Sequence, residues 1–284
     1  MKIHPTAVVS QDAAIAADVN VGPFVVVEAG ATIGSGCILE SRVVVKRGTT
    51  LGMGNHVFEG TVLGGLPQHI HPPELPGTLR IGNGNSFREN TTVHVALDAD
   101  KATVIGDENY FMVNVHIAHD CQIGNRTIFA NNVMLAGHVA VDDRAYISGA
   151  AAVHQFARIG RLAMVGGQAH ITRDVPPFVT VDGLSSLIVG VNHIGLRRAG
   201  IEPAGIRRIK DAYRVIYRSG LLWRDVLDQL RIEFTAGPAA EFHDFLVATT
   251  RGVTPERRTP PGATVRLYEE DDSAARRSLR AKVG

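Results

Sequence analysis

The most constraining feature of this chain is a large apolar residue at every sixth position. From Ile3 to Ile171 this residue is aliphatic or phenylalanine at every step except His69 and Ala99. A period of six fits neither an α-helix, with ~3.6 residues per turn, nor a long strand, which alternates every ~2 residues. It fits a short strand, a corner and the next short strand. The period therefore predicts a parallel β-helix of hexapeptide repeats.

The composition agrees with a narrow interior that is repeated many times. The 284 residues include 30 glycines, and only 6% are aromatic although 45% are hydrophobic. The chain resembles hexapeptide β-helices, which wind left-handed as a triangular prism with three hexads per coil. The expected fold class is an all-β left-handed parallel β-helix with a C-terminal α-helical domain.

Two interruptions and one end divide the repeat. Residues 65–79 and 95–103 break the pattern but keep its phase, so we expect two loops that leave the prism. We expect the prism over 1–190 and a helical domain over 191–252, with helices around 206–217, 221–234 and 238–250. Residues 253–284 mix proline, both charges and few apolar groups, which predicts a disordered tail.

The charge of the whole chain, +1, creates no field that would attract nucleic acid or a membrane. Residues 197–218, however, contain only Glu202 and Asp211 as acids beside seven basic side chains: Arg197, Arg198, Arg207, Arg208, Lys210, Arg214 and Arg218. This patch predicts an acidic partner or a phosphorylated ligand, and a solvated helix face is the alternative. Nucleic acid is disfavoured because few aromatic residues lie among the charges.

Other sequence features exclude several classes of protein. Cys37 and Cys121 are the only cysteines, which excludes a disulfide scaffold and a four-cysteine zinc site. The first residues do not form a signal peptide, and no apolar run approaches the ~18 residues of a membrane span. We therefore expect a cytoplasmic protein without stable membrane insertion.

Candidate catalytic residues gather at one corner of the predicted prism. Residues three hexads apart share a column, with about 4.8 Å between coils. One column holds His119, Gly137 and Gln155, the adjacent one holds Asp120 and His138, and His154 lies one place to the other side. Histidine is the side chain best suited to accept a proton near neutral pH, and Gly137 would leave an opening over the imidazole.

Alternatives remain for this corner. The side chains could simply face solvent. Three histidines could hold zinc, as in β-helices that resemble carbonic anhydrases. A Ser-His-Asp arrangement is weaker, because no serine falls in the columns. Neighbours on a strand point to opposite faces, which leaves open whether Asp120 orients His119.

Several segments closely resemble the UDP-N-acetylglucosamine O-acyltransferases of lipid A synthesis, and the resemblance runs from about residue 3 to residue 252. The segments that carry it include residues 115–121 (Val-His-Ile-Ala-His-Asp-Cys), 135–139 (Leu-Ala-Gly-His-Val), 153–156 (Val-His-Gln-Phe), 174–177 (Asp-Val-Pro-Pro) and 212–220 (Ala-Tyr-Arg-Val-Ile-Tyr-Arg-Ser-Gly).

The resemblance implies an activity and a set of roles. The family transfers an (R)-3-hydroxyacyl group from acyl carrier protein to the glucosamine 3-hydroxyl. It works as a homotrimer with active sites between neighbouring prisms, and no metal or cofactor is implied. His119 matches the general base, Asp120 its paired residue and the Gly137 N–H the oxyanion donor. The basic patch over residues 197–218 suits acyl carrier protein, which is acidic.

Further positions match the family's binding residues. Gly167 matches the position that limits acyl length, and glycine there would permit a longer chain. The substrate-binding positions are Gln68, His71, His116, His138, His154, Gln155, Asn192 and Arg198.

The acceptor-binding positions depart from the family pattern. The family has Gln-Asp-Leu-Lys where this chain has residues 68–71, Gln-His-Ile-His, and it has Glu and Arg at Ile194 and Ala199. We therefore expect UDP-N-acetylglucosamine or a related UDP-amino sugar, for example with a 3-amino group, as acceptor. The alternatives are an acyltransferase for a different nucleotide sugar, a noncatalytic homologue that binds a ligand or partner, and a zinc hydratase.

Overall fold

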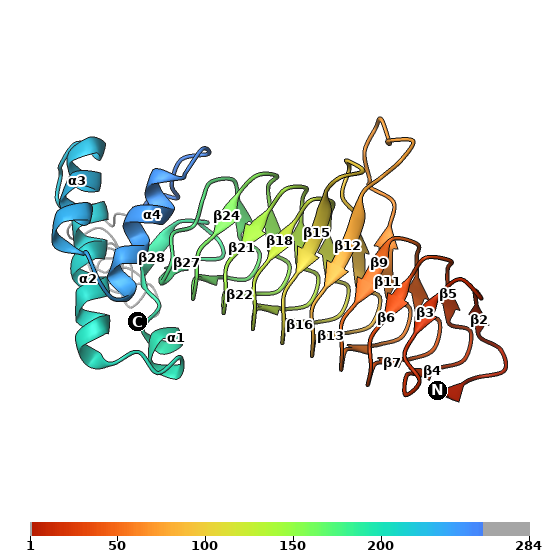
Figure 1. Ribbon diagram of the computed structural model, residues 1–284. Coiled ribbons are helices and arrows are strands. Elements are labelled where there is room, and N and C mark those ends of the chain that lie inside the picture. The colour runs from red at the N-terminus through yellow and green to blue at the C-terminus, as the bar shows by residue number, and fades with distance from the viewer. Residues whose placement is uncertain (1, 258–284) are drawn as a thin grey trace, which may run out of the picture.

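The computed structural model of the chain describes residues 2–257 and shows a long prism with helices at one end (Figure 1). Three sheets form the sides of the prism, and all strand pairs are parallel except β27 with β28. The N-terminus lies at the end of the prism away from the helices. The fold class predicted from the hexads is confirmed.

Each sheet takes one strand from every coil, so its strands lie three apart in the sequence order as far as β26. Sheet 1 contains β1 (Lys2–Ile3), β4 (Asn20–Val21), β7 (Ile38–Leu39), β10 (His56–Val57), β13 (Ser86–Phe87), β16 (Tyr110–Phe111), β19 (Ile128–Phe129), β22 (Tyr146–Ile147), β25 (Met164–Val165), β27 (Val179–Val181) and β28 (Ile188–Val191). Sheet 2 contains β2 (Val8–Val9), β5 (Val26–Val27), β8 (Val44–Val45), β11 (Val62–Gly65), β14 (Thr92–His94), β17 (His116–Ile117), β20 (Met134–Leu135), β23 (Ala152–Val153) and β26 (His170–Ile171). Sheet 3 contains β3 (Ala14–Ile15), β6 (Thr32–Ile33), β9 (Thr49–Leu51), β12 (Thr78–Ile81), β15 (Ala102–Ile105), β18 (Gln122–Ile123), β21 (Ala140–Val141) and β24 (Arg158–Ile159).

The large residue of each hexad points into the prism, where a column of such residues forms the core. Three phenylalanines, Phe87, Phe111 and Phe129, stack at centroid distances of 4.8 and 4.9 Å. Ile3 in the first coil is 40% exposed, because no earlier coil covers it.

The two predicted loops leave the prism between sheets 2 and 3. The long loop, residues 66–77, joins β11 to β12, and the short loop, residues 95–101, joins β14 to β15. Most paired residues are 18 apart, but Val62 pairs with Thr92 and Thr78 with Ala102. The insertions are whole hexads, which explains why the phase survives them. Leu75 has the phase of a core residue yet is 73% exposed, because it lies on the long loop.

The helical end differs in detail from the expectation. Its helices are α1 (His193–Arg198), α2 (Pro203–Arg218), α3 (Trp223–Glu233), the 3-10 helix η1 (Pro238–Ala240) and α4 (Glu241–Val247). The short α1 has no counterpart among the predicted helices. A single helix over 238–250 is wrong, because η1 occupies its first turn and α4 ends at Val247. None of the described helices is both long and apolar enough to cross a membrane.

Specific contacts fasten the helical end to the last coils. Arg161 Nε and Nη2 donate to the Glu241 carboxylate at 2.8 and 2.6 Å, and the Arg158 guanidinium lies 4.2 Å from the Phe245 ring centroid. Residues 253–257, which the sequence placed in the tail, pair with the last coils through Asp174 and Ile188. The remainder of the predicted tail lies outside the described residues.

Candidate active site

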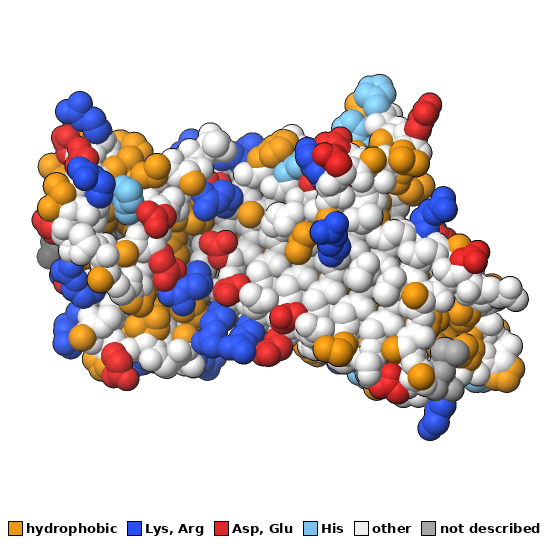
Figure 2. Space-filling view, in the orientation of Figure 1, with side chains coloured by type: hydrophobic (Ala, Val, Ile, Leu, Met, Phe, Trp, Pro, Cys, Tyr) orange, Lys and Arg blue, Asp and Glu red, His pale blue; other side chains and the backbone are white. Residues whose placement is uncertain are grey.

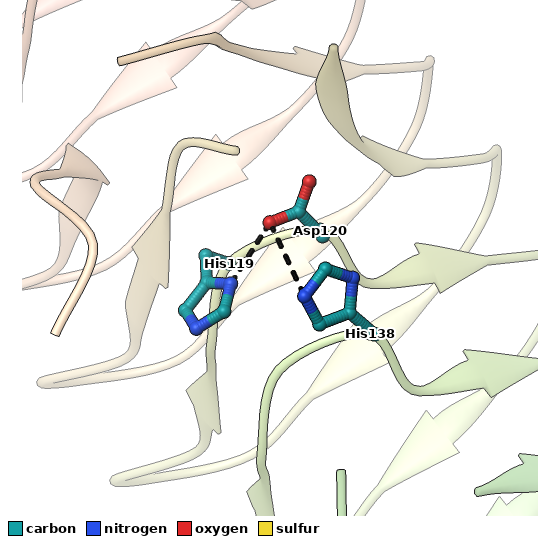
Figure 3. A group of neighbouring side chains, drawn as sticks. All are labelled: His119, Asp120 and His138. Carbon is teal, nitrogen blue, oxygen red and sulfur yellow. Dashed lines mark hydrogen bonds and ion pairs between the residues drawn. The ribbon is translucent and has the colours of Figure 1, made fainter. Parts of the chain in front are cut away.

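His119 and Asp120 form a hydrogen-bonded dyad at the corner after β17 (Figure 3). His119 Nδ1 lies 2.8 Å from Asp120 Oδ2, and the two side chains are only 11% and 6% exposed. A carboxylate accepts the Nδ1 proton, which leaves His119 Nε2 as the nitrogen able to take up a proton. The dyad has the arrangement of a general base with an orienting acid.

The alternation of side chains along a strand left open whether Asp120 orients His119, and the contact between the two side chains shows that it does. Alternation of side chains holds along a strand, but both residues lie beyond the end of β17. Asp120 has a positive φ of 60°, the left-handed conformation that recurs at the corners of this prism. This turn of the backbone brings its carboxylate back toward the preceding imidazole.

Two groups from the preceding coil hold Asp120 in place. The Asp120 N–H donates to Thr103 Oγ1 at 2.8 Å, and the Leu97 N–H donates to Asp120 Oδ2 at 3.0 Å. Thr103 lies on β15 and Leu97 on the short loop. The short loop therefore positions the dyad, a role that the sequence alone does not reveal.

Thr103→Val is expected to lower kcat by about 10- to 100-fold and leave KM nearly unchanged. The substitution keeps the side-chain volume but leaves the buried Asp120 N–H without its acceptor, at a cost of about 1–3 kcal/mol. Steady-state kinetics would measure this, and Thr103→Ser should restore most of the rate. Thr61, whose hydroxyl is equally buried on an earlier coil, provides the matched control Thr61→Val. Equal losses of kcat in Thr103→Val and Thr61→Val would contradict a positioning role for Thr103.

Gly137 leaves the face of the imidazole open, as the sequence predicts. A methyl group on Gly137 would lie 2.5 Å from His119 Cε1 and 2.7 Å from Nε2. Within residues 2–257 the Gly137 N–H donates to no protein acceptor. This backbone donor is therefore available beside the imidazole.

His138 stands on the other side of the dyad. Its Nε2 lies 3.9 Å from Asp120 Oδ2, and its ring stacks on Phe156 with centroids 4.5 Å apart. Burial lowers the pKa of His138, and the nearby Asp120 carboxylate acts in the opposite direction. The net shift of the His138 pKa is downward, which favours the neutral imidazole beside Asp120.

A pocket of about 510 Å³ opens in front of His119 on the face of sheet 2. The long loop contributes Gln68 and His69, and the His69 ring lies edge-on to His119 with centroids 6.2 Å apart. No Lys, Arg, Asp or Glu is among the residues that line it. They are Gln68, His69, His116, Ala118, His119, Met134, Leu135, Ala136, Gly137, Ala152, Val153, His154, Gln155 and His170.

His116 is a neutral polar group in this pocket. Its Nδ1 lies 2.9 Å from Thr92 Oγ1. Burial, with a further contribution from His94, lowers the pKa of His116 to about 4. It therefore carries no charge near pH 7 and can bind substrate only through hydrogen bonds.

His94 is a functional candidate that the sequence reasoning missed. It is 8% exposed, and its Nδ1 donates to the Leu66 carbonyl at 2.6 Å, at the start of the long loop. A side chain on Gly65 would press on the His94 ring, with a Cβ 3.1 Å from Nδ1. His94 thus fixes the base of the loop that carries Gln68 and His69. In the sequence, only the position of His94 directly after the inward-pointing Val93 could have indicated this role.

The remaining predicted residues lie away from the dyad pocket. The side chain of His71 does not line it, although its backbone N–H donates to His69 Nδ1 at 3.1 Å. Asn192 and Arg198 line a separate groove of about 690 Å³ with Tyr146 of β22 and with Arg144, which lies in the turn before that strand. Asn192 Oδ1 also caps α1 by accepting the Gly195 N–H at 2.9 Å. One chain therefore does not bring Asn192 and Arg198 to His119.

Gly167 also lies outside the dyad pocket, at a corner that follows sheet 1. A side chain there would be confined, because its Cβ would lie 3.3 Å from the Gly149 carbonyl oxygen.

The three histidines considered for zinc do not converge. His154 Nδ1 donates to the Gln155 carbonyl at 3.2 Å. Among the described residues, the side chains close enough to share an ion are His119, Asp120 and His138. There the Asp120 oxygen nearest His119 also accepts the Leu97 N–H.

Comparison with known proteins identifies the family. A profile described as UDP N-acetylglucosamine O-acyltransferase, domain 2, matches residues 174–254, and a bacterial transferase hexapeptide profile matches residues 102–137. An acyl-carrier-protein–UDP-N-acetylglucosamine O-acyltransferase of Paraburkholderia phymatum is 44% identical over 89% of this chain and 98% of its own. The Anaeromyxobacter dehalogenans enzyme of the same name is 43% identical over 89% of this chain and 100% of its own.

Solved structures agree with these matches. The Francisella novicida UDP-N-acetylglucosamine acyltransferase superimposes with a TM-score of 0.87 at 31% identity, over 93% of this chain and 99% of that one. The Acinetobacter baumannii structure has a TM-score of 0.85 at 38% identity, over 89% of this chain and 99% of that one. The chain is an enzyme that belongs to the UDP-N-acetylglucosamine O-acyltransferase family.

Proposed function

We propose that this enzyme transfers an (R)-3-hydroxyacyl group from acyl carrier protein to the 3-position of UDP-N-acetylglucosamine or a related UDP-amino sugar, the first step of lipid A biosynthesis. The observation that carries the proposal is the His119–Asp120 dyad, open toward the pocket at Gly137. The names of the relatives and solved structures support the donor and the acceptor.

The chemistry follows from the atoms of the dyad. His119 Nε2 takes the proton of the sugar hydroxyl as its oxygen attacks the thioester carbonyl. Asp120 stabilises the imidazolium that forms, through Nδ1. The Gly137 N–H donates to the oxyanion of the tetrahedral intermediate. As the intermediate collapses, the C–S bond breaks and His119 returns the proton to sulfur. The products are the acylated sugar nucleotide and the carrier thiol.

Substrate contacts are assigned to the residues that surround the dyad. Gln68, His116, His154 and Gln155 line the pocket and can bind the acceptor sugar through hydrogen bonds. His71 and His138 do not line the pocket, and they are proposed as further substrate contacts at its margin. Gly167 leaves space where a side chain would limit the acyl chain.

The acceptor is tested by a screen that compares UDP-N-acetylglucosamine with its 3-amino analogue. Purified enzyme is incubated with 3-hydroxyacyl carrier protein, and acylated nucleotide is measured by mass spectrometry. Turnover of either acceptor supports the proposal. Turnover of neither would refute it, and would favour the noncatalytic alternative. Zinc analysis of the same sample tests the hydratase alternative, which requires bound zinc.

We propose further that the active unit is a cytoplasmic homotrimer. Asn192 and Arg198 line a groove separate from the His119 pocket within one chain. A neighbouring copy that brings this groove to the dyad would complete the site, which is the arrangement the family resemblance implies.

Mixed oligomers provide a direct test of the shared site. His119→Ala and Arg198→Ala chains are each expected to be nearly inactive alone. If neighbouring chains supply the two residues, random trimers of both variants should regain about a quarter of the wild-type activity, because one site in four has both residues. Co-refolding the variants and measuring acyl transfer would show this. No recovery would place both residues in the same chain's site.

The acyl carrier protein is proposed to dock on the unpaired basic side chains of the helical end. Of the seven basic residues in 197–218, three have internal partners: Arg208 contacts the Glu233 carbonyl, Arg214 pairs with Asp211, and Arg218 pairs with Glu256. Arg197, Arg198, Arg207 and Lys210 form no ion pair within the described residues. Figure 2 shows blue side chains gathered over this end of the molecule.

A further inference from the structure

A pocket of about 580 Å³ lies where α1 connects to α2, and we call it the basic pocket. Its cationic side chains are Arg197, Arg207 and Lys210, and Glu202 is its only carboxylate. Ile201, Pro203 and Ile206 supply an apolar part, and the complete lining is His193, Arg197, residues 200–203, Ile206, Arg207 and Lys210. A ligand that fits this pocket combines apolar groups with several negative charges.

The cations of the basic pocket are not neutralised by the rest of the structure. No ion pair joins Arg197, Arg207 or Lys210 to a carboxylate anywhere in residues 2–257. The pocket also lies at the start of α2, a helix of 16 residues whose dipole places partial positive charge there. Both contributions raise the positive potential that an acidic ligand would meet.

The last described residues of the chain lie on the same helix as this pocket. Tyr213 Oη donates to Glu256 Oε1 at 2.6 Å, and Tyr217 Oη donates to the Thr254 carbonyl at 3.2 Å. Positions 206, 210, 213 and 217 follow the spacing that places residues on one face of a helix. Tyr213 is two turns beyond Ile206, or about 10 Å along the axis. The chain therefore reaches Arg257 on the face of α2 that carries the pocket.

The sequence beyond Arg257 contains a segment of matching chemistry. Leu267 and Tyr268 are followed directly by Glu269, Glu270, Asp271 and Asp272. Residues 258–266 separate this segment from Arg257, and an extended chain spans about 3.3 Å per residue, or ~30 Å here. This reach exceeds the ~10 Å from Tyr213 to Ile206 several times over.

We propose that residues 267–272 of the chain bind in its own basic pocket and compete there with the acyl carrier protein. The apolar pair faces Ile201 and Ile206, and the four carboxylates neutralise Arg197, Arg207 and Lys210. Tethering gives the segment a local concentration on the order of millimolar, so weak contacts suffice to occupy the pocket. Only the competition rests on the proposed function. The docking does not.

Docking is tested without any enzymatic assay. In the full chain, Glu269→Gln, Glu270→Gln, Asp271→Asn and Asp272→Asn together remove the acidic charges. A fluorescent peptide of residues 265–274 should bind this variant at low salt, and at least tenfold more weakly to the wild-type chain, whose pocket is occupied. Adding Arg207→Glu and Lys210→Glu to the variant should abolish binding. Equal binding to wild type and variant, or binding that survives the charge reversals, overturns the docking.

Competition is tested by kinetics on the same proteins. The acid-neutralised variant should have a KM for acyl carrier protein about three- to tenfold lower than wild type at low salt, with kcat unchanged. The difference should shrink as salt is raised, because exposed charges are screened. Arg276→Gln, Arg277→Gln and Arg280→Gln form the matched control and should leave KM unchanged. An unchanged KM in the acid-neutralised variant overturns the competition. Absence of acyl transfer from every protein would count against the proposed function, and peptide binding would still decide the docking.

Discussion

His119→Ala is expected to lower kcat for acyl transfer by about 10²- to 10⁴-fold while the prism stays folded. His119 lies at a corner, outside the core columns, so its removal leaves the packing of the prism intact. Among the described residues, His119 is the one histidine of this pocket that has a carboxylate partner. His116 lies against Thr92 and has a pKa of about 4, so it is a weak base near pH 7.

Single-turnover measurements with saturating acceptor would isolate the chemical step. His56→Ala is a suitable control, since His56 pairs with Glu40 and stacks on Phe58 on the face of sheet 1. A His119→Ala enzyme that keeps more than a tenth of the wild-type rate would exclude His119 as the base.

The pH dependence of the same reaction separates His119 from His116. A general base must be unprotonated, so the rate falls as pH is lowered. With a pKa of about 4, His116 stays neutral above about pH 5 and does not contribute to that fall. His116→Asn is therefore expected to raise KM for the acceptor but to leave the acidic limb of the kcat profile where it is in the wild type.

The hexads predict the prism because a period of six places one side chain per short strand in a narrow core. They also predict which residues share the corner with His119, since strands on successive coils pair 18 residues apart. The same rule fails on the coils that carry the loops, where pairing spans 24 or 30 residues. The contacts of Asp120 with Leu97 and of His94 with Leu66 fall on those coils.

The pairing of His119 with Asp120 shows a second limit. Whether adjacent residues point apart or together depends on the backbone between them, and the left-handed φ of Asp120 is not encoded by its residue type. Glycine and asparagine favour that conformation more than aspartate does. The stacking of coils imposes it here, as it does at His138 and Phe156 in the same column.

Gly137→Ala is expected to reduce kcat by about 100-fold or more, although the substitution adds a single methyl group. The methyl would stand 2.5 Å from His119 Cε1, closer than nonbonded carbon atoms approach, so the imidazole must turn away. Turning would break the 2.8 Å contact with Asp120 and misdirect Nε2 from the acceptor hydroxyl. The backbone offers little relief, because the neighbouring His138 N–H and Gly137 carbonyl are both bonded to adjacent coils.

Gly149→Ala is the matched control for this effect. Gly149 lies at another corner of the prism, and a methyl group there would meet only the Asn131 carbonyl at 3.2 Å. Both variants add the same group to the same kind of turn. If alanine at a corner destabilises the prism in general, the midpoint temperature of thermal unfolding should fall equally in both. A kcat loss confined to Gly137→Ala would trace the defect to the imidazole and the backbone donor. If both variants lose the same activity, the open face over His119 has no special role in catalysis.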